Sequence, residues 1–231
     1  TIVYQICEVL NPTNCDTASI TITVDAAPID AVNDTMTPIN GASGATTASV
    51  IVANGGAADS LNSTPLTMAD IGTKVSLTPG AAPTPAEGSI TMNADGTITV
   101  AAGTTAGTYA YPYTICEVLN PANCDTATAT VVVNAAPIVA NNDSYTGVNG
   151  ATGNPNVGNA YTDAGTGQDT LNGVVVDPSD IVGTVTTPAT SINGGPVPSL
   201  DPATGVVSVP AGTPAGNYTI EYRICEVLNA T

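Results

Sequence analysis

A hexapeptide that recurs at a fixed interval constrains this chain more than any other feature of its sequence. Ile-Cys-Glu-Val-Leu-Asn occurs three times, with its cysteine at Cys7, Cys116 and Cys225, so both intervals are 109 residues. The first two copies continue alike through Asn-Pro and Asn-Cys-Asp-Thr-Ala, and further on through Ala-Ala-Pro-Ile. Because this interval is the size of a whole small domain, we expect a tandem array of domains.

The repeat divides the 231 residues into three unequal parts. We predict that residues 1–25 are the C-terminal hairpin of a preceding repeat, 26–134 a complete immunoglobulin-like repeat, and 135–231 a repeat that lacks its last strand. The second cysteine of the third copy falls at position 233, so we expect the partner of Cys225 to lie outside this sequence. The sequence is therefore expected to be a piece of a longer protein.

Within each repeat, short segments alternate in period two and are rich in Thr, Val, Ile and Tyr, which is typical of β-strands. Turn dipeptides such as Asn54-Gly55 and Asp95-Gly96 separate these segments, and 23 Gly with 18 Pro leave no long helical stripe. The strands expected in the complete repeat span residues 50–52, 73–77, 89–92, 97–100, 109–115 and 126–133. We predict an all-β fold of tandem immunoglobulin-like β-sandwich domains, about 109 residues each, in a linear array.

The cysteines are spaced for disulfides across a hairpin. Cys7 and Cys15, like Cys116 and Cys124, flank seven residues that contain Asn-Pro, with strand-like sequence on both sides. The alternative, a redox or metal site, is disfavoured because the sequence has neither Cys-x-x-Cys spacing nor any histidine. Two hairpin disulfides indicate an oxidising, extracellular compartment.

Composition excludes several classes of function. Two cationic residues against 19 acidic ones give a net charge of −17, which rules out nucleic acid and anionic membrane surfaces as partners. Without histidine there is no Ser-His or Cys-His pair to activate a nucleophile. Lys74 is not repeated in the next copy, so we expect neither a Lys-activated nucleophile nor a repeated Lys-Asn crosslink. Glu8, Glu117 and Glu226 lie in the repeated hairpin, where three copies argue for scaffolding. We therefore predict that the chain has no catalytic residues and is not an enzyme.

The junctions between repeats are candidate calcium sites. Side-chain oxygens gather just after each Ala-Pro-Ile segment, and hard cations prefer such ligands. The candidate ligands are Asp30, Asn33, Asp34, Asn142 and Asp143. The alternative is that these residues only form turns, since Val139 replaces Asp30 in the next copy. We expect no cofactor other than calcium.

The repeated motif resembles a known family. Tyr-x-Ile-Cys-Glu-Val-Leu-Asn-Pro-x-Asn-Cys-Asp-Thr-Ala, preceded by the segment 209–218 and followed by Ala-Pro-Ile, is similar to the tandem repeats of giant Bacteroidetes surface adhesins, such as the gliding-motility adhesins exported by type IX secretion. The resemblance implies non-enzymatic stalk repeats of a long extracellular filament on a Gram-negative cell. Its partners would be neighbouring repeats, the outer-membrane anchoring or secretion machinery, and an external surface or glycan bound by other parts of the protein.

The resemblance also implies O-glycosylation, because this bacterial group modifies Asp-Ser/Thr followed by a small or aliphatic residue. The pattern occurs at Thr17, Thr35, Ser60, Thr126 and Thr170. Two other functions stay open. A carbohydrate-binding module would need an aromatic platform, whereas Tyr109, Tyr111 and Tyr113 alternate along one strand that we expect to face the core. A pilus-like subunit that assembles by strand donation would need the incomplete third repeat to be native.

Overall fold

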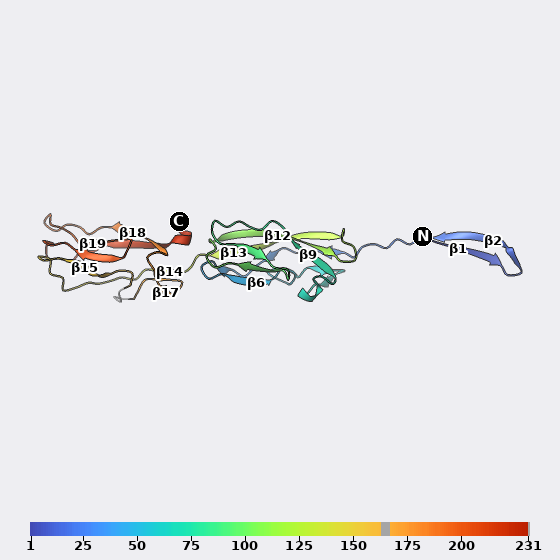
Figure 1. The fold of residues 1–231 in the computed structure, drawn as a ribbon, viewed down its shortest axis with the longest axis horizontal. Coiled ribbons are helices and arrows are strands. Elements are labelled where there is room, and N and C mark those ends of the chain that lie inside the picture. Colours follow the sequence, from blue (N-terminus) through green and yellow to red (C-terminus); the bar gives the residue numbers. More distant parts are fainter. Residues whose placement is uncertain (163–166, 231) are drawn as a thin grey trace.

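A computed structural model describes residues 1–162 and 167–230 of the chain. Three units follow one another along the long axis: a lone hairpin and two β-sandwiches (Figure 1). The only helices among these residues are two single-turn segments, η1 (Met68–Asp70) and η2 (Val227–Asn229). None of the helices in this part of the chain is long and apolar enough to cross a membrane. The prediction of an all-β fold built from β-sandwiches is confirmed.

The first sandwich has two main sheets and one small one. The order of the larger main sheet is β4-β13-β12-β9, with β5 also pairing with β13, and the order of the second is β10-β11-β6. The small sheet, β3-β7-β8, lies where the linker enters. The strands are β3 (Ile29–Asp30), β4 (Asp34–Thr35), β5 (Ile39–Asn40), β6 (Ala45–Ser49), β7 (Ser60–Leu61), β8 (Thr64–Pro65), β9 (Val75–Pro79), β10 (Ile90–Met92), β11 (Thr97–Val100), β12 (Gly107–Glu117) and β13 (Cys124–Asn134).

The long hairpin of β12 and β13 organises this core. Alternate side chains of β13 point inward, and Ala127, Ala129, Val131 and Val133 are all buried. On β12, Tyr113 stands opposite Ala127, so a large side chain meets a small one. Core side chains of β10 and β11 pack against this sheet from the other layer.

One expected strand, residues 50–52, is instead a buried turn. Val50 and Ile51 are fully buried, so the apolar run serves the core without joining a ladder. The Asn54 amide donates to the carbonyl oxygens of Ser49 at 2.6 Å and Val52 at 2.9 Å, and these bonds satisfy backbone groups that a strand would otherwise have paired. An apolar run alone does not distinguish these two structures.

The second sandwich repeats the first without counterparts of β4, β5 and β13 among the described residues. Its sheets are β14-β16-β17, β15-β20-β19 and the two-stranded β18-β21. The strands are β14 (Ile138–Val139), β15 (Asn154–Asn159), β16 (Thr170–Leu171), β17 (Val174–Val175), β18 (Ile181–Thr187), β19 (Ser199–Leu200), β20 (Val206–Val209) and β21 (Glu221–Glu226). Its core, centred on Tyr161 and Ile224, is much smaller than the first core.

The first unit consists only of the hairpin of β1 (Ile2–Glu8) and β2 (Asn11–Ile20). Cys7 stands opposite Cys15 in its ladder, as Cys116 stands opposite Cys124 in the first sandwich. An irregular segment joins β2 to β3, and the hairpin lies apart from the sandwich (Figure 1). Both of its faces are exposed.

Candidate functional site: the repeated hairpin and the joint between repeats

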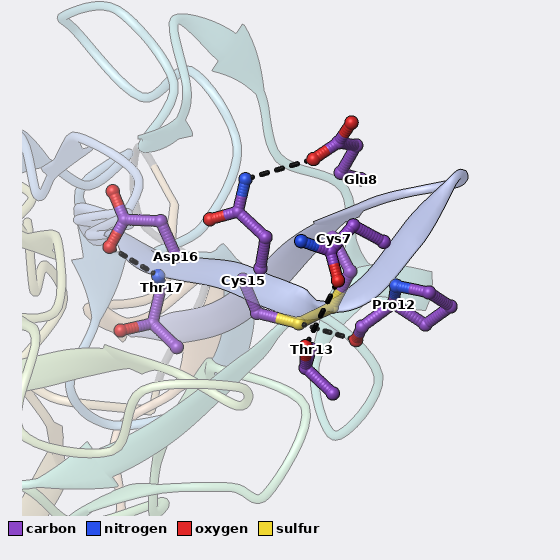
Figure 2. Close-up of a disulfide and its surroundings, with 9 residues drawn as sticks. Cys7, Glu8, Pro12, Thr13, Cys15, Asp16 and Thr17 are labelled. Carbon is purple, nitrogen blue, oxygen red and sulfur yellow. Dashed lines mark hydrogen bonds between the residues drawn. A yellow bond between two sulfur atoms is a disulfide. The ribbon is translucent and has the colours of Figure 1, made fainter.

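The repeated cysteines form the two disulfides that their spacing predicts. Cys7 is bonded to Cys15, with Cα atoms 4.1 Å apart (Figure 2). Cys116 is bonded to Cys124, with Cα atoms 4.0 Å apart. Each bond closes the end of a hairpin, directly across the ladder. Cys225, the third copy, is a free and partly exposed thiol.

The glutamates after Cys116 and Cys225 each bind the linker that enters their own sandwich. Asn123 Nδ2 donates to Glu117 Oε2 at 2.9 Å and to the Ala27 carbonyl at 2.7 Å. Donation from Asn120, Asn123 and the Ala27 backbone lowers the pKa of the Glu117 carboxyl, which is buried. In the third copy, the Ala136 backbone N–H donates to Glu226 Oε2 at 3.3 Å. The motif therefore acts as a clamp on the backbone between repeats.

The same clamp geometry forms in the lone hairpin, where no linker crosses it. Asn14 Nδ2 donates to Glu8 Oε2 at 3.1 Å (Figure 2), as Asn123 does to Glu117. The Glu-Asn pair is thus a local consequence of the hairpin sequence, and the linker contact is added by the sandwich around it.

Two loops of the second sandwich contact the preceding sandwich. The Ala106 backbone N–H donates to Oδ1 of Asn229, in η2, at 2.7 Å. Asn40 Nδ2 donates to Oδ1 of Asn172, in the turn between β16 and β17, at 2.9 Å. Leu228 is partly covered, whereas Leu119, its counterpart one repeat earlier, is 85% exposed. The η2 segment after β21 is therefore a surface that fits the base of the sandwich before it.

A second recurring feature is a tyrosine hydroxyl surrounded by oxygens inside the sandwich. The Tyr113 hydroxyl lies 3.0 Å from Asp34 Oδ2, 3.1 Å from Asp59 Oδ1 and 3.0 Å from the Val32 carbonyl oxygen. Burial raises the pKa of Asp34 to about 7 and that of Asp59 to about 6. Burial also raises the pKa of the Tyr113 hydroxyl, which stays protonated as the donor.

The second sandwich builds the same cluster. The Tyr222 hydroxyl lies 3.0 Å from Asp169 Oδ2, 3.4 Å from Asp143 Oδ2 and 3.1 Å from the Asn141 carbonyl oxygen. Burial raises the pKa of Asp169. In the first sandwich the cluster is buried, and the Tyr113 hydroxyl holds the segment after the linker and the turn at Val50 to β12. In the second sandwich Tyr222 is half-buried.

The calcium candidates of the first junction lie in three different environments. Asp30 lies in β3 and is exposed, Asn33 Oδ1 accepts the Thr128 N–H at 2.8 Å, and Asp34 points into the tyrosine cluster. At the second junction, Asp143 contacts Tyr222. Within residues 1–162 and 167–230, no three His, Cys, Asp or Glu side chains are grouped to hold a metal ion. Calcium binding stays a prediction.

The candidate glycan acceptors fall into two groups. Thr17, Thr35 and Thr126 are exposed, whereas Ser60 and Thr170 are half-buried in β7 and β16. The latter two follow Asp59 and Asp169, the carboxylates of the tyrosine clusters. Asp-Ser/Thr-Leu-Asn recurs at 59–62 and 169–172, and this recurrence was the signal that could have identified both buried aspartates.

The tyrosines of β12 offer no aromatic platform for sugars. Tyr111 and Tyr113 are buried and Tyr109 is half-buried, with its hydroxyl donating to the Thr105 carbonyl at 2.7 Å. The prediction that this strand faces the core is confirmed for Tyr111 and Tyr113.

The two β-sandwiches and the repeated contacts at the joint between them define a tandem β-sandwich repeat protein. No protein-family model and no curated protein sequence matches the chain. Among solved structures, it is similar to a SusE-like surface-located polysaccharide-binding protein from the heparin utilisation locus of Bacteroides thetaiotaomicron, with 15% identity, a TM-score of 0.30, and coverage of 79% of this chain and 28% of that one. The human Desmocollin-1 ectodomain matches at 13% identity and a TM-score of 0.32, with coverage of 87% and 37%. The chain thus spans less than two thirds of either protein.

Proposed function

We propose that this chain is a segment of the stalk of a long, secreted cell-surface adhesin, in which its repeats act as non-enzymatic spacers. The observation that carries the proposal is the repeated hairpin, which clamps the entering linker through Glu117 or Glu226 and docks on the preceding repeat through Asn229. A motif that occurs once in each domain and forms its hydrogen bonds at the joint serves to space and orient the domains.

The surrounding biology follows from the resemblance and the composition. The disulfides and the net charge of −17 suit an extracellular location, which we place at the surface of a Gram-negative bacterium of the Bacteroidetes. Export by type IX secretion and a role in gliding or surface adhesion belong to the same proposal. The outer-membrane anchor and the surface or glycan ligand would be bound by other parts of the protein.

The joint can be tested by comparing two matched asparagine variants of the whole chain. Asn229→Ala removes the contact to Ala106, so small-angle scattering should show a broader distribution of interdomain distances. Asn120→Ala is the control, because this residue supports its own glutamate in the same way but makes no contact with a preceding sandwich. Equal distance distributions for the wild type and Asn229→Ala would contradict a fixed joint and with it the spacer function.

A further inference from the structure

The segment with which the chain enters the first sandwich pairs with the strand by which it leaves, and the two run in the same direction. Asp34 of β4 lies opposite Ala129 of β13 in a parallel pairing. Further along the same strand, Ile39 of β5 lies opposite Val133, also in parallel. The linker from the hairpin ends just before this segment, and the chain passes to the second sandwich just after β13. The entry and exit points therefore lie at opposite ends of one parallel ladder, formed by residues 27–41 and β13.

This arrangement decides how tension along the chain acts on the parallel ladder. The hairpin of β12 and β13 runs along the long axis of the molecule, between the entering linker and the second sandwich (Figure 1). Tension through the two linkers pulls residues 27–41 back towards the entry point and pulls β13 forward. The two neighbours are thus sheared past each other, and all bonds between them bear the tension together. A ladder pulled apart from one end breaks one bond at a time instead.

Hydrogen bonds join the two partners from the entry point onward. At the entry end, Asn123 Nδ2, just before β13, donates to the Ala27 carbonyl at 2.7 Å. In the middle of the parallel ladder, the Thr128 N–H donates to Asn33 Oδ1 at 2.8 Å. These bonds and the evenly spaced bonds of a parallel pairing share the tension along the whole of β13.

At the exit end, the segment is held from two sides. The Gly41 N–H donates to the Asn134 carbonyl at 2.8 Å, and the Gly41 carbonyl accepts the N–H groups of Gly103 at 2.8 Å and Thr104 at 3.1 Å. A side chain at Gly41 would collide with the Thr104 carbonyl, so only glycine permits this contact. The carbonyl of Gly150 accepts two N–H groups in the same way in the second sandwich. The anchor is therefore a feature of the repeat.

Sliding the segment would also expose core side chains. Met36 and Ile39 are 2% and 7% exposed, and both belong to the core of the first sandwich. The Tyr113 hydroxyl, 3.0 Å from Asp34 Oδ2, ties the segment to β12 as well. Because moving these residues brings apolar surface into water, the hydrogen bonds and the packing must fail together.

We propose that the parallel ladder makes the repeat resist tension along the chain as a single unit. This inference rests on the proposed stalk function, since a stalk between a cell and a surface is stretched whenever the two are pulled apart. The rate of forced unfolding depends on the unfolding barrier and not on the overall free energy of unfolding. Shearing the parallel ladder sets that barrier, whereas the sheet β10-β11-β6 lies outside the path of the force.

The first test compares two directions of pulling on the whole chain, held at constant force in an optical trap with excess chelator. Handles at the two chain ends shear the parallel ladder. A handle at Ser43, in the turn after β5, and one at the C-terminal end peel it from its exit end. Ser43→Cys in a Cys225→Ser background carries this handle. At equal force, peeling should shorten the lifetime of the folded sandwich at least about tenfold, because the bonds then break singly.

The disulfide identifies the unfolding step of the first sandwich in these records. Cys116 and Cys124 are eight positions apart, so reduction should lengthen this step by roughly 25 Å. The lifetimes are then compared for this step alone.

A matched pair of asparagine variants tests which bonds bear the tension. Asn33→Ala removes the bond to Thr128 within the parallel ladder, so it should shorten the lifetime under tension about fivefold to tenfold. Asn93→Ala removes bonds to Thr97 and Thr99 in the opposite sheet and should leave that lifetime unchanged. Urea denaturation of both variants measures their cost without force.

Four outcomes would overturn the proposal. They are equal lifetimes in the two pulling directions, an unchanged lifetime of Asn33→Ala, a lifetime of Asn93→Ala that falls as far as that of Asn33→Ala, and release of residues 27–41 in a separate early step. None of them alters the interdomain distances that Asn229→Ala tests, so failure of this proposal is distinguishable from failure of the spacer function.

Discussion

The Tyr113 hydroxyl lies 3.0 Å from Asp34 Oδ2, and this contact ties the segment after the linker to the central strand of the sandwich. Asp59 reaches the same hydroxyl from a third segment of the chain, at 3.1 Å. The Tyr113 hydroxyl has one hydrogen to donate to the carboxylates of Asp34 and Asp59. Two buried negative charges would repel each other, so one of these two carboxyl groups must bind a further proton. The cluster therefore links folding to pH as well as joining three segments.

Removing the hydroxyl should destabilise the first sandwich markedly. Tyr113→Phe leaves two buried carboxylates without their shared donor, and we expect a loss of about 1–3 kcal/mol in the free energy of unfolding. Urea denaturation followed by circular dichroism measures this change. Tyr109→Phe, which removes a single bond to the Thr105 carbonyl, is the control, and an equal cost for both variants would contradict a special role of the cluster.

Stability should fall as the pH rises from about 4 to about 7. The folded-state pKa values of Asp34, about 7, and Asp59, about 6, lie above the ordinary value of 3.8, so the folded chain binds protons that the unfolded chain releases. Each such proton contributes a slope of up to about 1.4 kcal/mol per pH unit. Thermal melts at several pH values measure the slope, and Asp34→Asn should reduce it. A wild-type stability that rises across this range would refute the coupling.

The second disulfide should stabilise the first sandwich, whereas the first disulfide should not. Replacing both Cys116 and Cys124 by Ser removes a crosslink that closes a nine-residue loop, at a cost of roughly 2.5 kcal/mol in the free energy of unfolding. The same change at Cys7 and Cys15 affects a hairpin whose two faces are exposed. Denaturant midpoints of the sandwich that shift equally for both pairs would show that this reasoning is wrong.

Calcium should raise the melting temperature of the chain if the junction residues bind it, because an ion that binds only the folded state stabilises it by mass action. Since Asp34 points into the tyrosine cluster, we expect the exposed Asp30 to carry most of the response. Scanning calorimetry in millimolar calcium and in excess chelator, with Asp30→Asn as the comparison, measures it. Identical melting temperatures in both solutions would leave the junction residues as turn formers.

Glycans should occupy the exposed acceptors before the half-buried ones. We expect at least two of the candidate sites to carry sugar in protein from its native cell, with Thr17, Thr35 and Thr126 ahead of Ser60 and Thr170. Intact-mass analysis detects the modification, and fragmentation of the glycopeptides assigns it. A native sample at the bare mass of the disulfide-bonded sequence would exclude glycosylation.

The sequence by itself determined the features that depend on local spacing. The interval between Cys7 and Cys116 gives the length of the repeat, the interval between Cys116 and Cys124 places the disulfide across a hairpin, and period-two alternation buries Tyr111 and Tyr113. The repeat length is read directly from identical motifs, and the other two relationships are set within a few residues, so pattern and spacing are sufficient to predict them.

Only the tertiary structure decided which distant residues meet. Asp34 and Asp59 are 25 positions apart, and both reach Tyr113 because two sheets and a turn bring their segments to one point in the core. Asn229 meets Ala106 across two domains for the same reason. The direction of a polar side chain, toward solvent, a joint or the core, depends on desolvation and on partners that folding brings together, and no short-range pattern records them.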